Sequence, residues 1–281
     1  MFKCPICDSN EIKKKFNDDR YHYSIYKCRR CRLLFKDTKE IINYESLDID
    51  AYKIYDFSRK SEVEEIIKII KHCYSSDNFS KISILEIGSG SGSLLNEFRS
   101  FGFKNLYGVE PSKVACEYSI NAYNINVING YFNREIIKEK CDIILLYDVL
   151  EHLLNPHELI EEISKYMEKS TLLIIKTGDN NSINANILPR EWQYFKSSQH
   201  IRFYNKTSIS ELLNKYNIRI VRFYVFKHAY GGLHIGLLLR NIIFSLIVRF
   251  LFKIKLYVNS KNSYGIPLAN DHFIVLCKKT D

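Results

Sequence analysis

The sequence predicts an α/β protein whose main body is a doubly wound, mostly parallel sheet, preceded by a small cysteine-rich module. Apolar runs that suit buried strands alternate with helical segments from residue 82 onward, which is typical of a parallel sheet with crossover helices. A glycine-rich turn follows the first of these runs. Two C-x2-C pairs precede it. A length of 281 residues suits one large domain plus a small module.

The N-terminal module, residues 1–40, is defined by four cysteines separated by a basic, tyrosine-rich loop. These are Cys4, Cys7, Cys28 and Cys31. Two such pairs predict a zinc ribbon in which four thiolates hold a structural zinc ion, because a closed site of four sulfurs leaves no position for water. A disulfide framework is the alternative. It requires an oxidising compartment, and residues 1–7 lack the apolar stretch of a secretory signal.

Residues 41–80 form a linker and a first helix. The linker is rich in aromatic side chains, and we expect these to serve packing rather than ligand binding. Ser61 and Glu64 have the spacing of a capping box, which predicts a helix from Ser61 through Cys73. The main domain then covers residues 81–281.

The glycine-rich turn carries the first candidate ligand site. Glu86 interrupts the first apolar run, and Gly88, Gly90 and Gly92 follow with small residues between them. A dinucleotide fingerprint requires its third glycine where Ser93 stands. An acid ahead of the turn would repel a pyrophosphate and suits a ligand with an ammonium group. A purely structural tight turn is the alternative.

Three further strands follow in order. Glu110 ends the second strand, where an acid can accept both hydroxyls of a ribose, or can simply be solvated. A third strand at 126–129 leads to Gly130 and Tyr131, and a fourth strand at 141–148 ends at Asp148. A helix at 156–167 and a fifth strand at 171–176 come next. We expect a closing strand at 271–277 to pair antiparallel with 218–226.

These motifs together resemble the class I S-adenosylmethionine-dependent methyltransferases, and Leu150-Glu151-His152 resembles the signature of a subgroup that includes quinone and sugar enzymes. The resemblance covers residues 83–213 well and the ends loosely. It implies a Rossmann-like sheet in which the glycine loop packs on the cofactor and the acids hold its amino group and ribose. The implied cofactor-binding residues are Glu86, Gly88, Gly90, Gly92, Glu110, Tyr131 (where the family usually has an acid for adenine) and Asp148.

The candidate catalytic residues follow from the same resemblance. An oxygen or carbon acceptor must lose a proton, and imidazole titrates near neutral pH. His200, just before a helix expected at 208–216, is the preferred general base. His152 is the second candidate, or it stabilises its own turn. Glu151 is expected to organise the site. Gln199 stands where sugar C-methyltransferases commonly have an acid, so carboxylate assistance there is in question.

The net charge of +9 is unevenly distributed. Residues 1–36 carry ten Lys/Arg and four Asp/Glu, and residues 214–270 carry nine Lys/Arg and no acid. Basic ends suit a phosphate-bearing acceptor or an anionic membrane surface, although a coding bias towards Lys, Ile and Asn explains them equally. Residues 233–257 predict an inserted amphipathic helix. We expect this helix to pack on the domain, to form a homodimer or to contact the inner face of the membrane. The protein itself is expected to be cytoplasmic.

The sequence therefore predicts S-adenosylmethionine-dependent methyl transfer to an oxygen or carbon of a small molecule. The resemblance of the ribbon to that of sugar C-methyltransferases favours a sugar, nucleotide-linked or part of a bacterial surface glycan. An RNA-binding or RNA-modifying protein is the alternative class. Against it, the motif of amino-methylating nucleic-acid enzymes is absent, since Asn155-Pro156 continues into His157. A non-catalytic scaffold is the third possibility.

Overall fold

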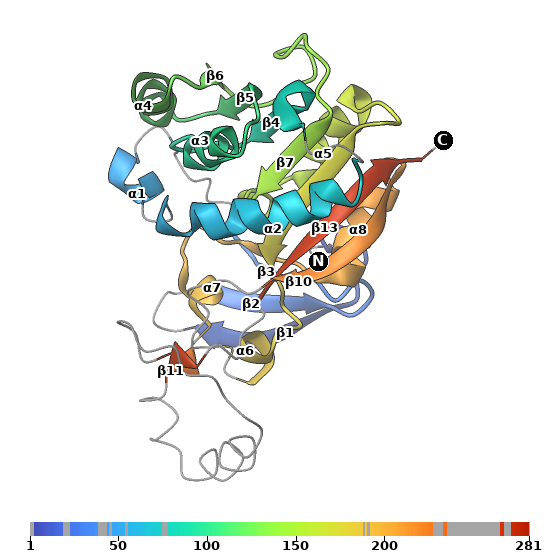
Figure 1. The fold of residues 1–281 in the computed structure, drawn as a ribbon. Helices are drawn as coiled ribbons and strands as arrows, with labels where there is room; N and C mark the ends of the chain where they lie inside the picture. The colour runs from blue at the N-terminus through green and yellow to red at the C-terminus, as the bar shows by residue number, and fades with distance from the viewer. Residues whose placement is uncertain are drawn as a thin grey trace.

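Two main sheets and one two-stranded sheet contain the strands that the structure describes (Figure 1). The computed structural model describes residues 3–18, 23–38, 44, 47–53, 56–74, 78–187, 189, 192–226, 233–234, 265–266 and 271–280. In the view of Figure 1 the larger sheet occupies the upper part of the molecule, and the N-terminal strands lie below it.

The larger sheet has seven strands in the order β10-β13-β8-β7-β4-β5-β6. The central five strands are parallel, and β13 is antiparallel to both of its neighbours. This confirms the predicted α/β fold with a mostly parallel sheet, and also the closing antiparallel strand. The strands are β4 (Ser83–Ile87), β5 (Asn105–Glu110), β6 (Asn126–Asn129), β7 (Ile143–Tyr147), β8 (Leu172–Gly178), β10 (Ile218–Phe226) and β13 (His272–Lys279).

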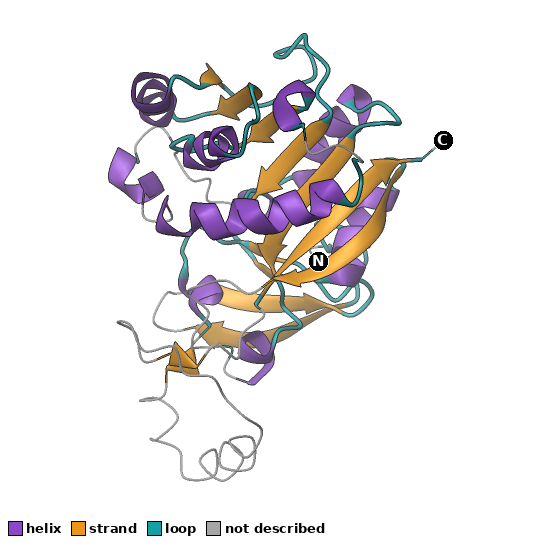
Figure 2. Cartoon of the chain, in the orientation of Figure 1, coloured by secondary structure: helices purple, strands orange, loops and turns teal. Residues whose placement is uncertain are grey.

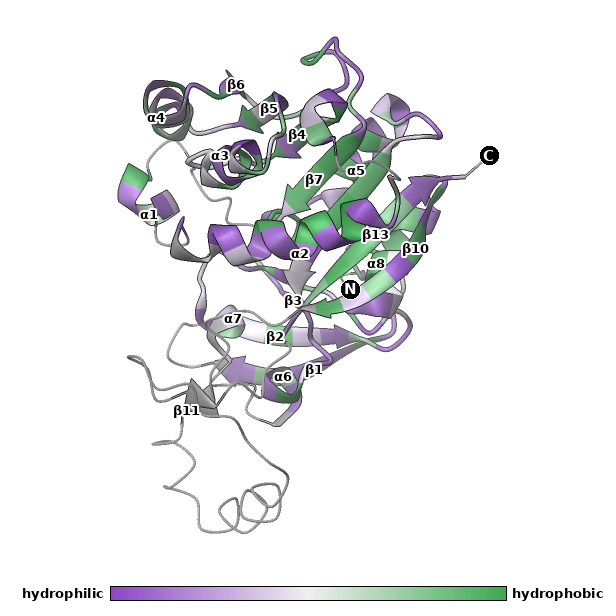
Figure 3. Ribbon diagram, in the orientation of Figure 1, coloured by the Kyte–Doolittle hydropathy of each residue, from purple (hydrophilic) through white to green (hydrophobic). Residues whose placement is uncertain are grey.

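Helices cover both faces of this sheet (Figure 2). Side chains of β7 alternate between two apolar clusters. Ile144 and Leu146 pack in the cluster that contains α5 (Pro156–Tyr166) and α8 (Lys206–Asn214). Ile143, Leu145 and Tyr147 pack in the cluster that contains α2 (Arg59–Lys71), α3 (Ser93–Ser100) and α4 (Lys113–Tyr123). Figure 3 shows the resulting hydrophobic centre of the sheet. A central strand that is buried on both faces reads as a continuous apolar run, as β7 does.

The N-terminal strands form a second sheet, in the order β1-β2-β3-β9. Strands β1 (Ile12–Asp18), β2 (Tyr23–Cys28) and β3 (Leu34–Lys36) belong to the cysteine-rich module, whereas β9 (Arg202–Phe203) comes from the main domain. A third apolar cluster fills the space beside this sheet and includes Trp192 and Phe195. It is built partly by the short helices α6 (Ile183–Ile187) and α7 (Gln193–Lys196). The N-terminal module and the main domain are therefore joined by the pairing of β3 with β9 and by this aromatic cluster.

The first long helix differs from its prediction at the N-terminus. It begins at Arg59, and Ser58 is its N-cap residue. Ser61 Oγ donates to the carbonyl of Ser58 at 2.8 Å, so Ser61 lies inside the first turn. The predicted capping box is therefore wrong. The chain has already turned in the 3-10 helix η2 (Asp56–Ser58), which starts the helix earlier.

The remaining elements are short: α1 (Ile49–Lys53), η3 (Phe79–Lys81), η4 (Leu150–His152), β11 (Leu233–His234) and β12 (Gly265–Ile266). Of the helix predicted at 233–257, only 233–234 are described, and they pair as β11 with β12. The rest of that prediction lies outside the described residues. Within the described ranges, no helix is both long and apolar enough to cross a membrane.

Candidate active site

The loop between β4 and α3 has a left-handed backbone that favours glycine. Gly88, Gly90 and Gly92 have φ angles of 76°, 52° and 75°, which side chains with a Cβ rarely adopt. At Gly88 and Gly92, neighbouring atoms also leave no room for a Cβ atom. A Cβ at Gly88 would lie 2.7 Å from Val149 Cγ2, and one at Gly92 would lie 1.9 Å from Ser119 Oγ. The turn therefore presents only backbone at these three positions, as the glycine spacing predicts.

Tyr52 of α1 lies over the middle of this loop. Its Cδ1 atom is 3.1 Å from the position a Cβ at Gly90 would take. The ring of Tyr44 makes an edge contact with His152 at 6.3 Å between centroids. Burial raises the pKa of Tyr44, and the charges of Glu151 and Glu110 add to this. Two linker aromatics thus pack beside the candidate site, and that they serve packing rather than ligand binding stays a prediction.

Glu110 ends β5 beside the loop, and two backbone amides orient its carboxylate. Gly90 N–H donates to Oε2 at 2.8 Å, and Ser112 N–H donates to Oε1 at 2.9 Å. Burial raises the pKa of Glu110, although both amides oppose this. Each carboxylate oxygen keeps a further lone pair. A carboxylate fixed in this way can accept two hydroxyl groups of a ligand.

Glu86 is buried, with 3% of its surface exposed. Its Oε2 atom has no hydrogen-bond partner among the described residues. Burial raises the pKa of Glu86 to about 8, the guanidinium of Arg59 opposes this, and Glu110 and Glu62 add to it. A buried polar oxygen without a donor costs about 1–3 kcal/mol. A cationic donor such as an ammonium group would remove that cost, so the chemistry of Glu86 fits the ligand that the sequence predicts.

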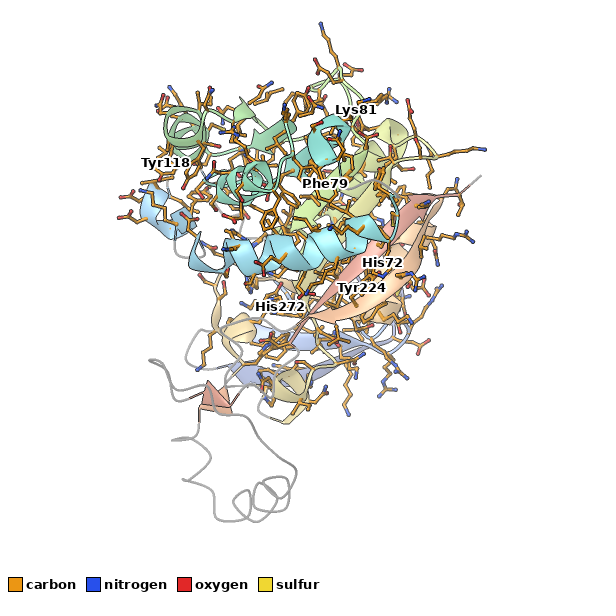
Figure 4. The ribbon with its side chains drawn as sticks, in the orientation of Figure 1. His72, Phe79, Lys81, Tyr118, Tyr224 and His272 are labelled. Atoms are coloured by element: carbon orange, nitrogen blue, oxygen red, sulfur yellow. The ribbon has the colours of Figure 1, made fainter. Side chains whose placement is uncertain are left out.

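Asp148 follows β7 and is held by a buried lysine. Lys176 of β8 is fully buried, and its Nζ atom lies 2.8 Å from Asp148 Oδ2 and 3.2 Å from Glu62 Oε1. Burial opposes ionisation of Asp148, but Lys176 and His272 outweigh it and hold its pKa at about 2. His272, labelled in Figure 4, is the first residue of β13. Asp148 is therefore a carboxylate at neutral pH.

Glu151 lies in η4, directly after this strand end, and is fully buried. Thr177 Oγ1 donates to its Oε2 at 3.1 Å, and the hydroxyl of Tyr194 donates to its Oε1. Burial and the charge of Asp148 raise the pKa of Glu151 to about 8. Both hydroxyl donors fix the orientation of this carboxyl group, and that Glu151 organises the site stays a prediction.

His152 and His200 form a pair of neutral imidazoles. Their ring centroids lie 4.9 Å apart. His152 Nδ1 lies 3.1 Å from the carbonyl of Gln199, and His200 Nδ1 lies 3.0 Å from the carbonyl of Tyr194. A carbonyl only accepts, so Nδ1 carries the proton in each ring and Nε2 keeps the lone pair. Burial lowers the pKa of His152, and burial together with His152 lowers that of His200 well below its usual range.

The predicted site residues thus fall into two groups at the carboxyl ends of the parallel strands. Glu86, the glycines and Glu110 form the first group, and Asp148, Glu151, His152 and His200 form the second. Tyr131 is the least enclosed of the predicted set, with 69% of its surface exposed. Sequence reasoning missed Lys176, Thr177 and Tyr194, which hold the second group in place. A lysine directly after the apolar residues 172–175 of β8 is a sequence signal that could have found Lys176.

The four N-terminal cysteines also come together. Cys4 Sγ lies 3.5 Å from Cys31 Sγ, and Cys7 Sγ lies 3.5 Å from Cys28 Sγ. All four sulfurs lie within 4.8 Å of one another, are buried, and are free thiols. With zinc–sulfur bonds of about 2.3 Å, the edges of a sulfur tetrahedron measure about 3.8 Å. The four side chains therefore fit a structural zinc ion.

Comparison with known proteins places the chain in a family. A family model described as a methyltransferase domain matches residues 59–222, more than half of the chain, and the chain belongs to this family. No curated protein matches the sequence.

Solved structures share the fold. An S-adenosylmethionine-dependent methyltransferase from Archaeoglobus fulgidus is 16% identical with a TM-score of 0.54, over 82% of this chain and 97% of that chain. The plantazolicin methyltransferase BamL is 17% identical with a TM-score of 0.54, over 83% and 89%. A possible histamine N-methyltransferase from Thermotoga maritima is 17% identical with a TM-score of 0.51, over 83% and 96%. At such identities the likeness concerns the fold.

Proposed function

We propose that this methyltransferase-family chain transfers a methyl group from S-adenosylmethionine to a small-molecule acceptor. The observation that carries the proposal is the unpartnered buried oxygen of Glu86, next to a glycine loop and to the fixed carboxylate of Glu110. An ammonium group suits Glu86, and two vicinal ribose hydroxyls suit Glu110. The BamL structure, which has a similar fold, contains SAH, the demethylated form of this donor.

The second group of residues provides the acceptor chemistry in this proposal. The sulfonium of the donor makes its methyl group electrophilic. The residues of the chain must then align the acceptor with that methyl group, exclude water and remove the acceptor proton. His200 is neutral, and its Nε2 lone pair suits a general base. His152 lies beside it, and Glu151 is already held by two hydroxyl groups.

We assign the acceptor to the sugars, nucleotide-linked or part of a glycan. The support is the position of the N-terminal module: its strand β3 pairs with β9, two residues after His200. Lys36 N–H also donates to the carbonyl of Ile201 at 3.0 Å. The basic module therefore adjoins the acceptor group of residues, where a phosphate-bearing sugar would benefit from its charge.

Binding of the donor is the first test. Glu110→Gln replaces one carboxylate oxygen with an NH2 group, which cannot accept, so the hydrogen bond from either Gly90 N–H or Ser112 N–H is lost. We expect the Kd for S-adenosylmethionine, measured by calorimetry, to rise at least tenfold, or about 1.4 kcal/mol. Glu117→Gln on α4 makes the same charge change at an exposed ion pair with Lys113 and should bind as the unchanged protein does. Equal affinity in both variants contradicts the ribose assignment, and absence of binding to the unchanged protein contradicts the proposed function.

The acceptor class is tested separately. Transfer of labelled methyl from S-adenosylmethionine should occur to nucleotide sugars and not to quinols or catechols of similar size. Transfer confined to the non-sugar acceptors would contradict the assignment while leaving the methyltransferase activity intact.

A further inference from the structure

The acceptor group of residues has the composition of a metal site. Potential ligand atoms of Glu151, His152 and His200 all lie within 4.8 Å of one another. Two imidazoles and one carboxylate are the protein ligands of many catalytic metal centres, in which the remaining coordination positions stay open. This set differs from the four thiolates of the N-terminal module, because three protein ligands leave a coordination position open for a substrate.

Each of the three side chains already has the partner that orients a metal ligand. Metal-binding histidines donate their second ring N–H to a carbonyl or carboxylate, which fixes the tautomer. His152 and His200 do this through Nδ1, to the carbonyls of Gln199 and Tyr194. Both Nε2 lone pairs are thereby reserved for another group. Glu151 is held in turn by Thr177 and Tyr194.

Charge near the cluster also favours a cation. Asp148 lies three residues before Glu151, and its charge acts on both imidazoles. Its Oδ1 atom is buried without a hydrogen-bond partner among the described residues. Lys176 neutralises the other oxygen, and Lys36 acts on His200 from the side of the N-terminal module. Ligand atoms about 2.1 Å from one cation lie about 3.4 Å apart in a tetrahedron, so small side-chain rotations are enough to close the set.

The geometry points to a divalent transition-metal cation bound by a carboxylate oxygen of Glu151 and by Nε2 of His152 and His200. This inference rests on the proposed function, and it assigns His200 to the metal rather than to proton transfer. The acceptor hydroxyl binds at an open position, where a divalent cation can lower the pKa of bound water from 15.7 to about 7. The hydroxyl proton is lost to water when the hydroxyl binds the cation, before the acceptor is aligned with the donor and water is excluded. The oxygen then forms a bond to the methyl carbon. The carbon–sulfur bond breaks with its electron pair on sulfur, giving a methyl ether and S-adenosylhomocysteine.

The test uses the full chain with zinc in the cysteine site and Mn²⁺ as the probe. Mn²⁺ prefers oxygen and nitrogen donors to thiolates, and its electron paramagnetic resonance signal reports the free ion. We expect one Mn²⁺ bound per chain. Glu151→Gln and His200→Gln should each weaken binding at least tenfold. His72→Gln, a histidine labelled in Figure 4 that lies at the end of α2, should bind as the unchanged protein does.

Binding of S-adenosylmethionine, measured by calorimetry, reports whether each variant is folded. Glu151→Gln and His200→Gln leave Glu86 and Glu110 unchanged, so donor affinity should stay within twofold. Absence of Mn²⁺ binding, or equal binding in all four proteins, overturns the metal site. Donor binding without Mn²⁺ binding refutes this inference alone. Mn²⁺ binding without donor binding refutes the proposed function and leaves the metal site standing.

Discussion

Gly92 offers the sharpest test of how the glycine loop is built. It is the N-cap residue of α3 and has a φ angle of 75°. A Cβ there would lie 1.9 Å from Ser119 Oγ and 2.9 Å from Ser119 Cβ, both on α4. Gly92→Ala therefore destabilises the protein in two separate ways, by backbone strain and by a steric clash. The backbone angle becomes unfavourable, and the loop or α4 must move.

The free-energy costs of the backbone strain and of the steric clash can be separated. The left-handed conformation costs a residue with a Cβ about 1–2 kcal/mol, and overpacking typically costs about 1–3 kcal/mol. We expect Gly92→Ala to lower the free energy of unfolding by about 2–5 kcal/mol. Gly102 has a φ angle of 95° and no atom within 4 Å of its Cβ position. Gly102→Ala should therefore lower the free energy of unfolding only by the cost of the backbone angle, about 1–2 kcal/mol.

Equilibrium unfolding in urea measures both variants, and calorimetry measures their affinity for S-adenosylmethionine. Gly92→Ala should weaken donor binding at least tenfold, whereas Gly102→Ala should leave it unchanged. In the Ser119→Gly background the added cost of Gly92→Ala should fall to that of the backbone angle alone. Equal destabilisation by Gly92→Ala and Gly102→Ala, within about 0.5 kcal/mol, would refute the packing argument.

Three further predictions concern charge and metal. Lys176→Met leaves buried carboxylates without their cation and should cost about 3–5 kcal/mol in urea unfolding. Lys165→Met, at an exposed pair, should leave the unfolding curve nearly unchanged. Since the pKa of Glu86 rises from 4.5 to about 8 on folding, stability falls as pH rises between these values, by up to about 1.4 kcal/mol per unit. Glu86→Gln should reduce this decrease of the unfolding free energy with pH. Parallel pH profiles of the variant and the unchanged protein would contradict the assignment to Glu86. Cys31→Ser should abolish the zinc content measured by mass spectrometry, whereas Cys73→Ser, at an exposed thiol, should retain it.

Much of the fold follows from patterns within short segments. The strand at 126–129, the closing hairpin and the helix after Asn155-Pro156 lie where the sequence predicts them. Each depends on local information: apolar runs, capping residues and a proline at the first helical turn. The glycine loop was equally readable, because its left-handed backbone requires a residue type that is visible in the sequence.

The missed features depend on contacts between distant segments. Strand β9 joins the N-terminal sheet through two residues, too few for any periodic signal. The hydroxyl of Tyr194 reaches Glu151 across 43 positions of sequence, and Lys176 reaches Glu62 across 114. A sequence shows that such side chains exist, but pairing them requires the topology of the sheet to be known first.

The acidic side chains at this edge of the sheet differ chiefly in whether the protein supplies their counter-charge. Asp148 has Lys176 beside it, and its pKa is held at about 2. Burial instead raises the pKa of Glu86 and of Glu151 to about 8. A carboxyl group with a raised pKa is one whose ionised form the protein leaves under-stabilised, so a bound cation gains most there. The proposed ammonium group at Glu86 and the proposed metal ion at Glu151 would each supply this missing counter-charge.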